Sequence, residues 1–195
     1  DPPMQDALTF RAPRPEDGPR VTRLIADCPP LDLNSAYCNL LQCTHFASTC
    51  ILAERRGEAA LLGWISGYLI PESPDKLFIW QVAVAESARG QGLAGNMLER
   101  LLARPSLQGV RYLVTTITPD NDASWAFCRG FAARHGCSIA ERPLFEKERH
   151  FAGRHETEWE LTIGPLSAVR SIPKGEQRHE QTRTFPYPAR PLDLR

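Results

Sequence analysis

The sequence predicts an α+β fold in which a mixed, mostly antiparallel sheet is flanked by helices. Residues 50–55, 61–70 and 77–84 have the pattern of consecutive strands, with a turn at 56–58 between the first two. A glycine-rich segment and a helical pattern follow, and a β-branched strand comes next at 110–117. This order joins an antiparallel meander to one right-handed crossover between parallel strands.

The chain is long enough for one domain with one sizeable core, since 42% of its 195 residues are hydrophobic. We place this domain at residues 8–163, after an N-terminal extension at 1–7. Frequent proline and charge with little apolar periodicity predict a disordered tail at 164–195.

The charge and the cysteines exclude several classes of protein. The 23 Lys and Arg residues balance 23 Asp and Glu residues, so no net field favours nucleic acid or an anionic membrane. No apolar stretch approaches the ~20 residues of a transmembrane helix, and the N-terminus lacks the plan of a secretion signal. We expect a cytoplasmic protein whose six cysteines, which form no C-x-x-C pair, are reduced structural thiols.

Local patterns predict the elements before the meander. A short strand is expected at 7–12. The following segment carries apolar residues at helical spacing until the pair Pro29-Pro30, which ends that helix. Capping residue types at 32–35 then open a second helix, and Cys43 is the last residue of its apolar face.

The elements after the glycines are predicted in the same way. A helix over about 91–103 has leucines at spacings of three and four and ends before Pro105. Beyond the next strand, Asn121 is a suitable cap for a helix that Gly136 ends. An alternating pattern predicts a last strand at roughly 156–163.

Gly90, Gly92 and Gly95 spell G-x-G-x-x-G between a strand and a helix, which is the pattern of a dinucleotide-binding turn. That interpretation fails because three strands precede the turn and the next strand ends in 115–118, TTIT, without an acidic residue. A Walker P-loop fails because no Gly-Lys-Ser or Gly-Lys-Thr follows. In the remaining interpretation, 89–94 is a Gln/Arg-x-x-Gly-x-Gly/Ala loop whose N–H groups approach a diphosphate at the positive end of a helix. A tight turn without a ligand stays open as the alternative.

The loop resembles the acetyl-CoA loop of the GCN5-related N-acetyltransferases (GNAT), together with "WQVAV" before it and "TPDNDASWAF" after the next strand. The resemblance implies a GNAT fold whose sheet is splayed at the acetyl-CoA site. It implies cofactor contacts from Val82, Val84, Arg89, Gly90, Gln91, Gly92, Leu93, Ala94 and Asn121.

Two positions at the helix predicted from Asn121 to Gly136 have alternative roles. Asn121 is equally well accounted for as a simple helix cap. Many family members carry a tyrosine seven residues later, where it can protonate the departing thiolate, whereas this chain has Cys128. A role for this thiol is disfavoured, because water can also protonate the thiolate.

Longer blocks, among them "CPPLDLNSAYCNLLQCTHFASTC" and "HFAGRHETE", resemble the L-2,4-diaminobutyrate acetyltransferase family of ectoine biosynthesis over about residues 8–163. That family transfers acetyl from acetyl-CoA to the 4-amino group of the diamino acid and is generally homodimeric. The resemblance implies that Asp32, Trp80 and Glu158 hold the substrate, and that Tyr37 and His155 contribute to the same pocket.

A diamino acid presents one carboxylate and two ammonium groups, so its pocket needs carboxylates or aromatic faces for the cations and a donor for the anion. The attacking nitrogen must be neutral, which costs about 4 kcal/mol at pH 7 for an alkylamine. We expect one carboxylate to anchor the α-ammonium while Glu158, or a water it orders, takes the γ proton. Asp32 and Glu158 are therefore the candidate catalytic residues. A strand N–H near 82–84 is the expected donor to the acyl oxygen.

The sequence also leaves simpler roles open for these residues. Asp32 could be a cap, Trp80 core packing, His155 a satisfied loop histidine and Glu158 a solvated strand residue. The acceptor could be another small amine, an aminoglycoside or a protein N-terminus, or the chain could be a non-catalytic acyl-CoA sensor. A Cys43/His45 or Cys38/His45 nucleophile pair is disfavoured. Residues 155–159, HETEW, do not form the H-E-x-x-H motif of a catalytic metal, so we expect no metal.

Overall fold

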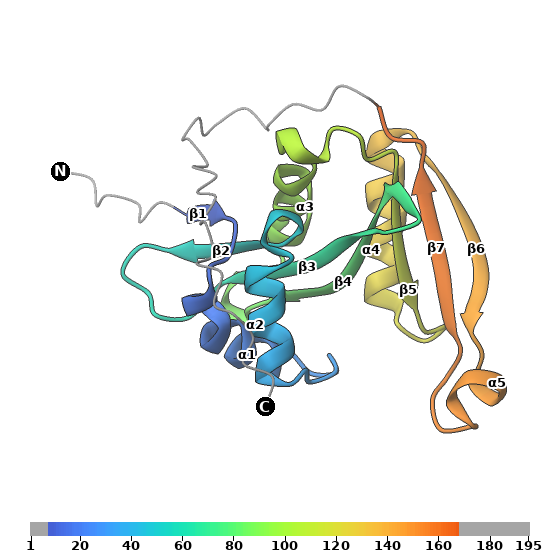
Figure 1. The fold of residues 1–195 in the computed structure, drawn as a ribbon, viewed down its shortest axis with the longest axis horizontal. Coiled ribbons are helices and arrows are strands. Elements are labelled where there is room, and N and C mark those ends of the chain that lie inside the picture. Colours follow the sequence, from blue (N-terminus) through green and yellow to red (C-terminus); the bar gives the residue numbers. More distant parts are fainter. Residues whose placement is uncertain (1–7, 168–195) are drawn as a thin grey trace, which may run out of the picture.

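The computed structural model describes residues 8–167, which form a seven-stranded sheet with helices on both faces (Figure 1). The order across the sheet is β1-β2-β3-β4-β5-β7-β6. Only β4 and β5 pair in parallel, so the predicted mixed, mostly antiparallel sheet is confirmed. The strands are β1 (Leu8–Arg11), β2 (Ile51–Arg55), β3 (Gly63–Ile70), β4 (Ser73–Val84), β5 (Tyr112–Ile117), β6 (Ser138–Phe145) and β7 (Glu158–Gly164).

Side-chain hydrogen bonds cap the first turns of two helices, α2 and α4. Ser35 accepts a hydrogen bond from the Cys38 N–H at 3.1 Å, and Asn121 accepts one from Ser124 at 3.2 Å. Gly136 ends its helix at φ +60°, as the sequence predicts. The helices are α1 (Gly18–Ala26), α2 (Ala36–Thr44), α3 (Leu93–Leu102), α4 (Asp122–His135) and α5 (Lys147–Phe151).

Two apolar cores lie on the two faces of the sheet. On one face, Met97 of α3 and Phe131 of α4 are buried with Ala53 of β2. On the other face, Val21 of α1 and Leu52 of β2 are buried in a second cluster that also includes residues of α2. Successive residues of β2 thus serve opposite faces, which is the side-chain alternation of a strand covered on both sides.

The structure adds an arm that the sequence patterns do not predict. Strand β6 runs beside β7 as the edge strand of the sheet, and the short helix α5 lies in the connection between them, beyond the strand ends (Figure 1). Strand β6 escaped prediction because it is an exposed edge strand that carries charges and Pro143, which edge strands tolerate. Helix α5 has only five residues, too few to show helical periodicity.

The C-terminal boundary also differs from the prediction. Gly164 belongs to β7, and Leu166 is buried in the core with its N–H bound to the Arg111 carbonyl at 2.7 Å. Ordered packing therefore continues past residue 163. The expected extension at 1–7 and the rest of the expected tail, 168–195, lie outside the described residues. Within 8–167, no helix has the length and apolar character needed to cross a membrane.

Candidate active site

The parallel strands β4 and β5 separate at the centre of the sheet. They pair only at Lys76–Tyr112, Leu77–Leu113 and Phe78–Val114. One further contact, from the Thr115 hydroxyl to the Ile79 carbonyl at 3.0 Å, marks the point of divergence. Beyond it, β4 continues to Val84 and β5 to Ile117 without a shared ladder. The two strand ends form the walls of a gap.

The main-chain groups of Val82 and Val84 point into this gap. The Ala85 N–H donates to the Leu62 carbonyl at 2.8 Å, which makes Gly63–Val84 a non-hydrogen-bonded pair of the β3–β4 ladder. The N–H and C=O of Val84, and those of Val82 two residues earlier, therefore point away from β3. The Val84 carbonyl already accepts hydrogen bonds from the Arg89 Nε and the Cys28 thiol.

A β-bulge at Trp80 reorganises β4 just before the gap opens. The β3–β4 register passes from Ser66–Gln81 directly to Gly67–Ile79, so Trp80 is an extra residue. Ile79 consequently packs in the core beneath α3 and α4, whereas residue 83 packs beneath α1 and α2. The Trp80 ring is 42% exposed and lies edge-on to Tyr68 at 6.1 Å, so Trp80 is not buried core packing.

The glycine-rich loop opens α3 on one side of the gap. Gly90 and Gly92 have φ of +75° and +71°, a left-handed conformation that L-residues with a side chain adopt at a cost. A Cβ atom at either glycine would meet nothing within 4 Å, so the space beside this backbone is open. Gly92 is also the N-cap of α3, whose first N–H groups have no partner within the helix.

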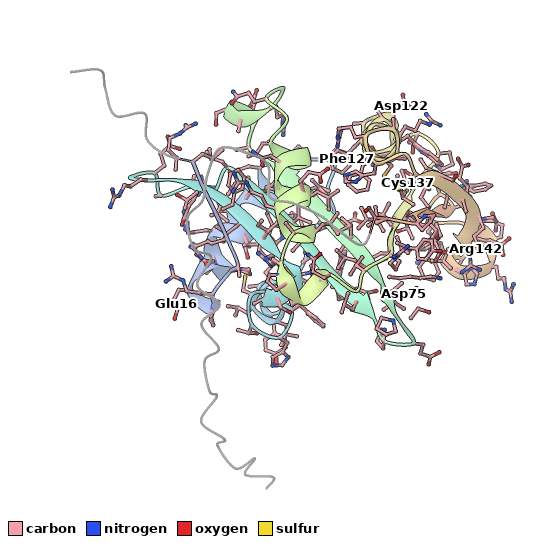
Figure 2. The ribbon with its side chains drawn as sticks, turned by 90° about the horizontal axis from the view of Figure 1, so that it is seen from above. Glu16, Asp75, Asp122, Phe127, Cys137 and Arg142 are labelled. Atoms are coloured by element: carbon pink, nitrogen blue, oxygen red, sulfur yellow. The ribbon has the colours of Figure 1, made fainter. Side chains whose placement is uncertain are left out.

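A cavity of about 750 Å³ lies along this loop, between α3 and α4. Its walls are glycine backbone, apolar side chains such as Phe10 and Phe127, and arginines. Figure 2, seen from above, shows Phe127 in the space between α3 and α4. The Arg134 guanidinium reaches across the cavity, since a Cβ on Gly95 or Gly130 would lie 3.4 or 3.5 Å from it. Main-chain donors, apolar walls and cations suit an elongated ligand with a diphosphate.

Most of the predicted cofactor residues surround this cavity. Val84, Arg89, Gly90, Gly92, Leu93 and Ala94 line it. Val82 lies on the gap but not in the lining, while Gln91 and Asn121 are exposed outside it. The Asn121 side chain caps α4, so its predicted contact with the cofactor stays a prediction. Residues Arg100, Phe127 and Arg134 are additions, which only the packing of α3 against α4 brings to the cavity.

A second group of side chains lies at the other wall of the gap. Glu158, the first residue of β7, has its Oε1 3.8 Å from the His155 Nε2. Burial raises the pKa of the Glu158 carboxyl, and the charge of Asp32 raises it further, while His155 and a hydrogen bond with Thr116 of β5 oppose the shift. The structure therefore places His155 beside Glu158, three residues away in the sequence, and brings the distant Asp32 close enough for its charge to act on Glu158.

The environment of His155 fixes which ring nitrogen carries hydrogen. Its Nδ1 lies 2.6 Å from the Glu156 carbonyl, which can only accept, so Nδ1 is the donor. The Nε2 is left on the side of Glu158. Thr116 is a site residue that sequence analysis missed, because its hydroxyl reaches Glu158 only through the pairing of β5 with β7.

The segment that carries Asp32 is attached to β4. The Gln81 amide donates to the Asp32 carbonyl at 2.8 Å, next to the exposed Trp80. Asp32 itself is exposed and caps no helix, since Ser35 is the N-cap of α2. Tyr37 lies on α2 with 71% of its surface exposed, and its predicted part in acceptor binding stays a prediction.

The thiols are packed as small hydrophobic groups. Cys128 is 6% exposed in the core, and burial raises its pKa to about 11. Burial raises the pKa of Cys43 to about 12, so its thiolate population is negligible at neutral pH. Among residues 8–167, no group of three or more His, Cys, Asp and Glu side chains is placed to hold a metal ion.

Comparisons with known proteins agree with this geometry. The profile of the acetyltransferase (GNAT) family matches residues 19–132. The chain is 51% identical to the L-2,4-diaminobutyric acid acetyltransferase of Methylotuvimicrobium alcaliphilum over 164 residues, which cover 84% of this chain and 94% of that protein. It is 50% identical over 150 residues to the protein of the same name from Vibrio parahaemolyticus, covering 77% and 82%.

A solved structure extends the similarity to three dimensions. It is the diaminobutyrate acetyltransferase EctA from Paenibacillus lautus in complex with its substrate L-2,4-diaminobutyric acid and coenzyme A. The present chain superposes on it with a TM-score of 0.77 at 38% identity, covering 86% of this chain and 99% of that one.

Proposed function

The chain belongs to the acetyltransferase (GNAT) family and, within it, to the L-2,4-diaminobutyric acid acetyltransferases, and we propose that it acetylates the 4-amino group of L-2,4-diaminobutyrate. Acetyl-CoA is the donor, and the product is N4-acetyl-L-2,4-diaminobutyrate, as in ectoine biosynthesis. One observation carries the proposal. The β4–β5 gap has a glycine loop along one side and two acidic residues at its opposite walls: Gln81 holds the main-chain carbonyl of Asp32, and Thr116 bonds the Glu158 carboxylate.

The residues of the cleft fit acetyl-CoA. The N–H groups at the start of α3 would hold the diphosphate, and Arg89 and Arg134 would add positive charge. The inward main-chain groups of Val82 and the N–H of Val84 would bind the pantetheine amides as an additional strand would. When bound, acetyl-CoA supplies an activated thioester, so no side-chain nucleophile is required.

We assign the two ends of the acceptor to different groups. The exposed Asp32 carboxylate anchors the α-ammonium, and the Trp80 face covers the aliphatic chain. His155 and Tyr37 complete the polar rim of the pocket. Each assignment combines the family resemblance with the position of the side chain beside the gap.

Glu158 is placed to take the proton of the 4-ammonium group. An alkylammonium with a pKa of about 10 costs about 4 kcal/mol to deprotonate at pH 7. Because the pKa of Glu158 is raised, it lies closer to the pKa of the ammonium group. Proton transfer from the ammonium to the carboxylate is therefore less unfavourable. The neutral amine then attacks the thioester directly, and an N–H of Val82 or Val84 donates to the acyl oxygen as it gains charge. As the intermediate collapses, the nitrogen loses its second proton to water and the departing thiolate takes a proton from water, since Cys128 is buried in the core.

We further propose that the enzyme is a cytoplasmic homodimer. Tyr37 and Leu40, which lie three residues apart on α2, are 71% and 38% exposed, and Leu33 in the segment before α2 is 73% exposed. A second copy of the chain would cover such a face. Sedimentation of the purified protein should give the mass of a dimer. Cell fractionation should recover the protein in the cytoplasmic fraction, where acetyl-CoA is available.

The activity is tested by mixing the protein with acetyl-CoA and each candidate amine while following thiol release. We expect turnover with L-2,4-diaminobutyrate and acetylation at N4, identified by proton NMR of the product. An aminoglycoside and a peptide N-terminus should be poor acceptors. Turnover of one of these alone would replace the substrate assignment, and acetyl-CoA binding without any turnover would indicate a non-catalytic sensor.

A further inference from the structure

A chain of buried amides connects α1 to the edge of the acceptor pocket. The Asn39 amide of α2 donates to the Thr22 hydroxyl of α1 at 2.9 Å. The Asn34 amide donates both to the Asn39 carbonyl oxygen at 3.2 Å and to the Gln81 oxygen at 2.7 Å. Asn39 is 1% exposed and Gln81 is 7% exposed, so solvent competes little for these bonds.

Gln81 holds the segment that carries Asp32 at a fixed distance from strand β4. Its Nε2 donates to the Asp32 carbonyl at 2.8 Å while its oxygen accepts from Asn34, so both ends of the amide bind the segment that carries Asp32. Its own main chain follows the Trp80 bulge, and its N–H donates to the Ser66 hydroxyl at 3.1 Å. The length of this one side chain therefore sets how far the Asp32 segment lies from the strand that faces the thioester.

We propose that Gln81 is a positioning residue that selects the chain length of the diamino acid, an inference that rests on the proposed function. The acceptor must span from its α-ammonium, held by Asp32, to a nitrogen that reaches the thioester at β4. Diaminopropionate, diaminobutyrate and ornithine differ by one methylene each in this span. A glutamine side chain is longer than an asparagine side chain by the same single methylene. The length of the Gln81 side chain therefore sets the distance between Asp32 and the thioester to within about one methylene.

Two substitutions separate the effect of the length of the Gln81 side chain from the effect of its amide hydrogen bonds. Gln81→Asn keeps an amide but draws it back by one methylene, which pulls the Asp32 segment toward β4. We expect the ratio of kcat/KM for diaminopropionate to that for diaminobutyrate to rise about tenfold. Gln81→Met keeps the length but removes both hydrogen bonds. We expect KM for diaminobutyrate to rise about tenfold, with KM for acetyl-CoA changed less than twofold.

The matched control is Gln108→Met. Gln108 is also partly buried and donates to main-chain carbonyls, those of Leu102 and Arg104, but it lies beyond the end of α3, away from the pocket. This variant loses the same kind of hydrogen bond and should keep the kinetic constants of the parent. Asn34→Ala removes the hydrogen bond to the Gln81 oxygen without changing β4. It should reproduce the KM increase of Gln81→Met, which would show that the increase does not come from a change within β4 alone.

A measurement without substrate tests the positioning role independently of activity. Exchange of the Leu31 amide hydrogen, whose N–H donates to the Cys28 carbonyl at 3.0 Å, should be at least tenfold faster in Gln81→Met than in the parent, and unchanged in Gln108→Met. Unchanged exchange in folded Gln81→Met would overturn the positioning role. An unchanged preference in Gln81→Asn, with active enzyme, would overturn the chain-length role. If the parent acetylates none of the three diamino acids, the proposed function fails instead and the chain-length role with it.

Discussion

The acetyl-CoA cleft and the proposed acceptor pocket meet at the β4–β5 gap, but the cleft consists mainly of main-chain groups and the pocket of side chains. The cleft uses main-chain groups of a continuous stretch from Val82 to Gly95, with glycines that keep side chains away. The pocket that we propose uses side chains from separate segments, with Asp32 before α2, Trp80 in the β4 bulge and Glu158 at the start of β7. The lining of the cleft includes three arginines and one glutamate, Glu99, whereas the proposed pocket includes the carboxylates of Asp32 and Glu158.

This difference indicates how each region should respond to mutation. A main-chain site is damaged where a Cβ atom enters space that the ligand needs, and most other substitutions leave its N–H groups in place. A side-chain site loses a specific charge when one residue changes. Substitutions in the pocket should therefore affect diaminobutyrate, and glycine substitutions in the loop should affect acetyl-CoA.

The largest effect is expected for Glu158→Gln, which removes the proposed base while keeping its shape. We expect kcat to fall by about 10²- to 10⁴-fold. In the parent, activity needs the ionised carboxylate, so the acid limb of the kcat profile should lie above the ordinary glutamate pKa of 4.5. An unchanged kcat would remove Glu158 from the role.

Thermal unfolding separates this loss from misfolding. Because the pKa of Glu158 is raised in the folded state, its contribution to stability is present at low pH and is lost as pH rises through the folded pKa. At pH 7 Glu158→Gln should therefore melt at or above the temperature of the parent. A lower melting temperature would mean that the carboxylate is mainly structural.

The next effect is expected for Asp32→Asn. Loss of a charge-assisted hydrogen bond of about 1.5–3 kcal/mol should raise KM for diaminobutyrate about 10- to 100-fold and leave KM for acetyl-CoA unchanged. Asp27→Asn is the control, because Asp27 pairs with Arg23 at an exposed end of α1. Equal increases in both KM values for Asp32→Asn would show that the two regions are not separate.

A smaller effect is expected for Gly92→Ala, compared with Gly57→Ala in the β2–β3 turn. Both glycines have positive φ, +71° and +85°, and at both a Cβ would meet nothing within 4 Å. Each substitution should cost about 1–2 kcal/mol of stability from backbone strain. Only Gly92→Ala should raise KM for acetyl-CoA, by about tenfold, and steady-state kinetics with thermal melts would show this. Equal kinetic constants in the two variants would contradict a diphosphate site at the loop.

The smallest effect is expected for Cys128→Ala. Cys128 lies in the core and its pKa is raised to about 11, so we expect kcat within about twofold of the parent and a stability loss on the order of 1 kcal/mol. Single-turnover measurements of thiol release would test this. A tenfold slower release in the folded variant would show that the thiol, rather than water, supplies the proton.

The same contrast explains how much could be predicted from the sequence. The glycine loop and the helix from Asn121 to Gly136 depend on neighbouring residues, and local chemistry predicts both. The Trp80 bulge and the contact of Thr116 with Glu158 depend on strand register, which no local pattern determines. Asp32 and Glu158 were accessible only through resemblance to a family.

The arm shows a second limit of sequence patterns. Strand β6 carries Arg142 and Pro143 on an exposed edge, so it lacks the apolar alternation of the inner strands (Figure 2). Its place is set by pairing with β7, and that pairing in turn holds the start of β7, where Glu158 lies. Part of the support for the pocket therefore comes from the segment with the weakest local signal.

The central claim is that the open backbone from Arg89 to Ala94 receives the diphosphate of acetyl-CoA and aims its thioester at the gap. Calorimetric titration of the folded protein with acetyl-CoA tests this claim most directly. We predict saturable binding of one acetyl-CoA per chain, weakened about tenfold in Gly92→Ala and unchanged in Gly57→Ala and Asp32→Asn. No heat of binding to well-folded protein, or equal affinity in the parent and Gly92→Ala, would contradict it.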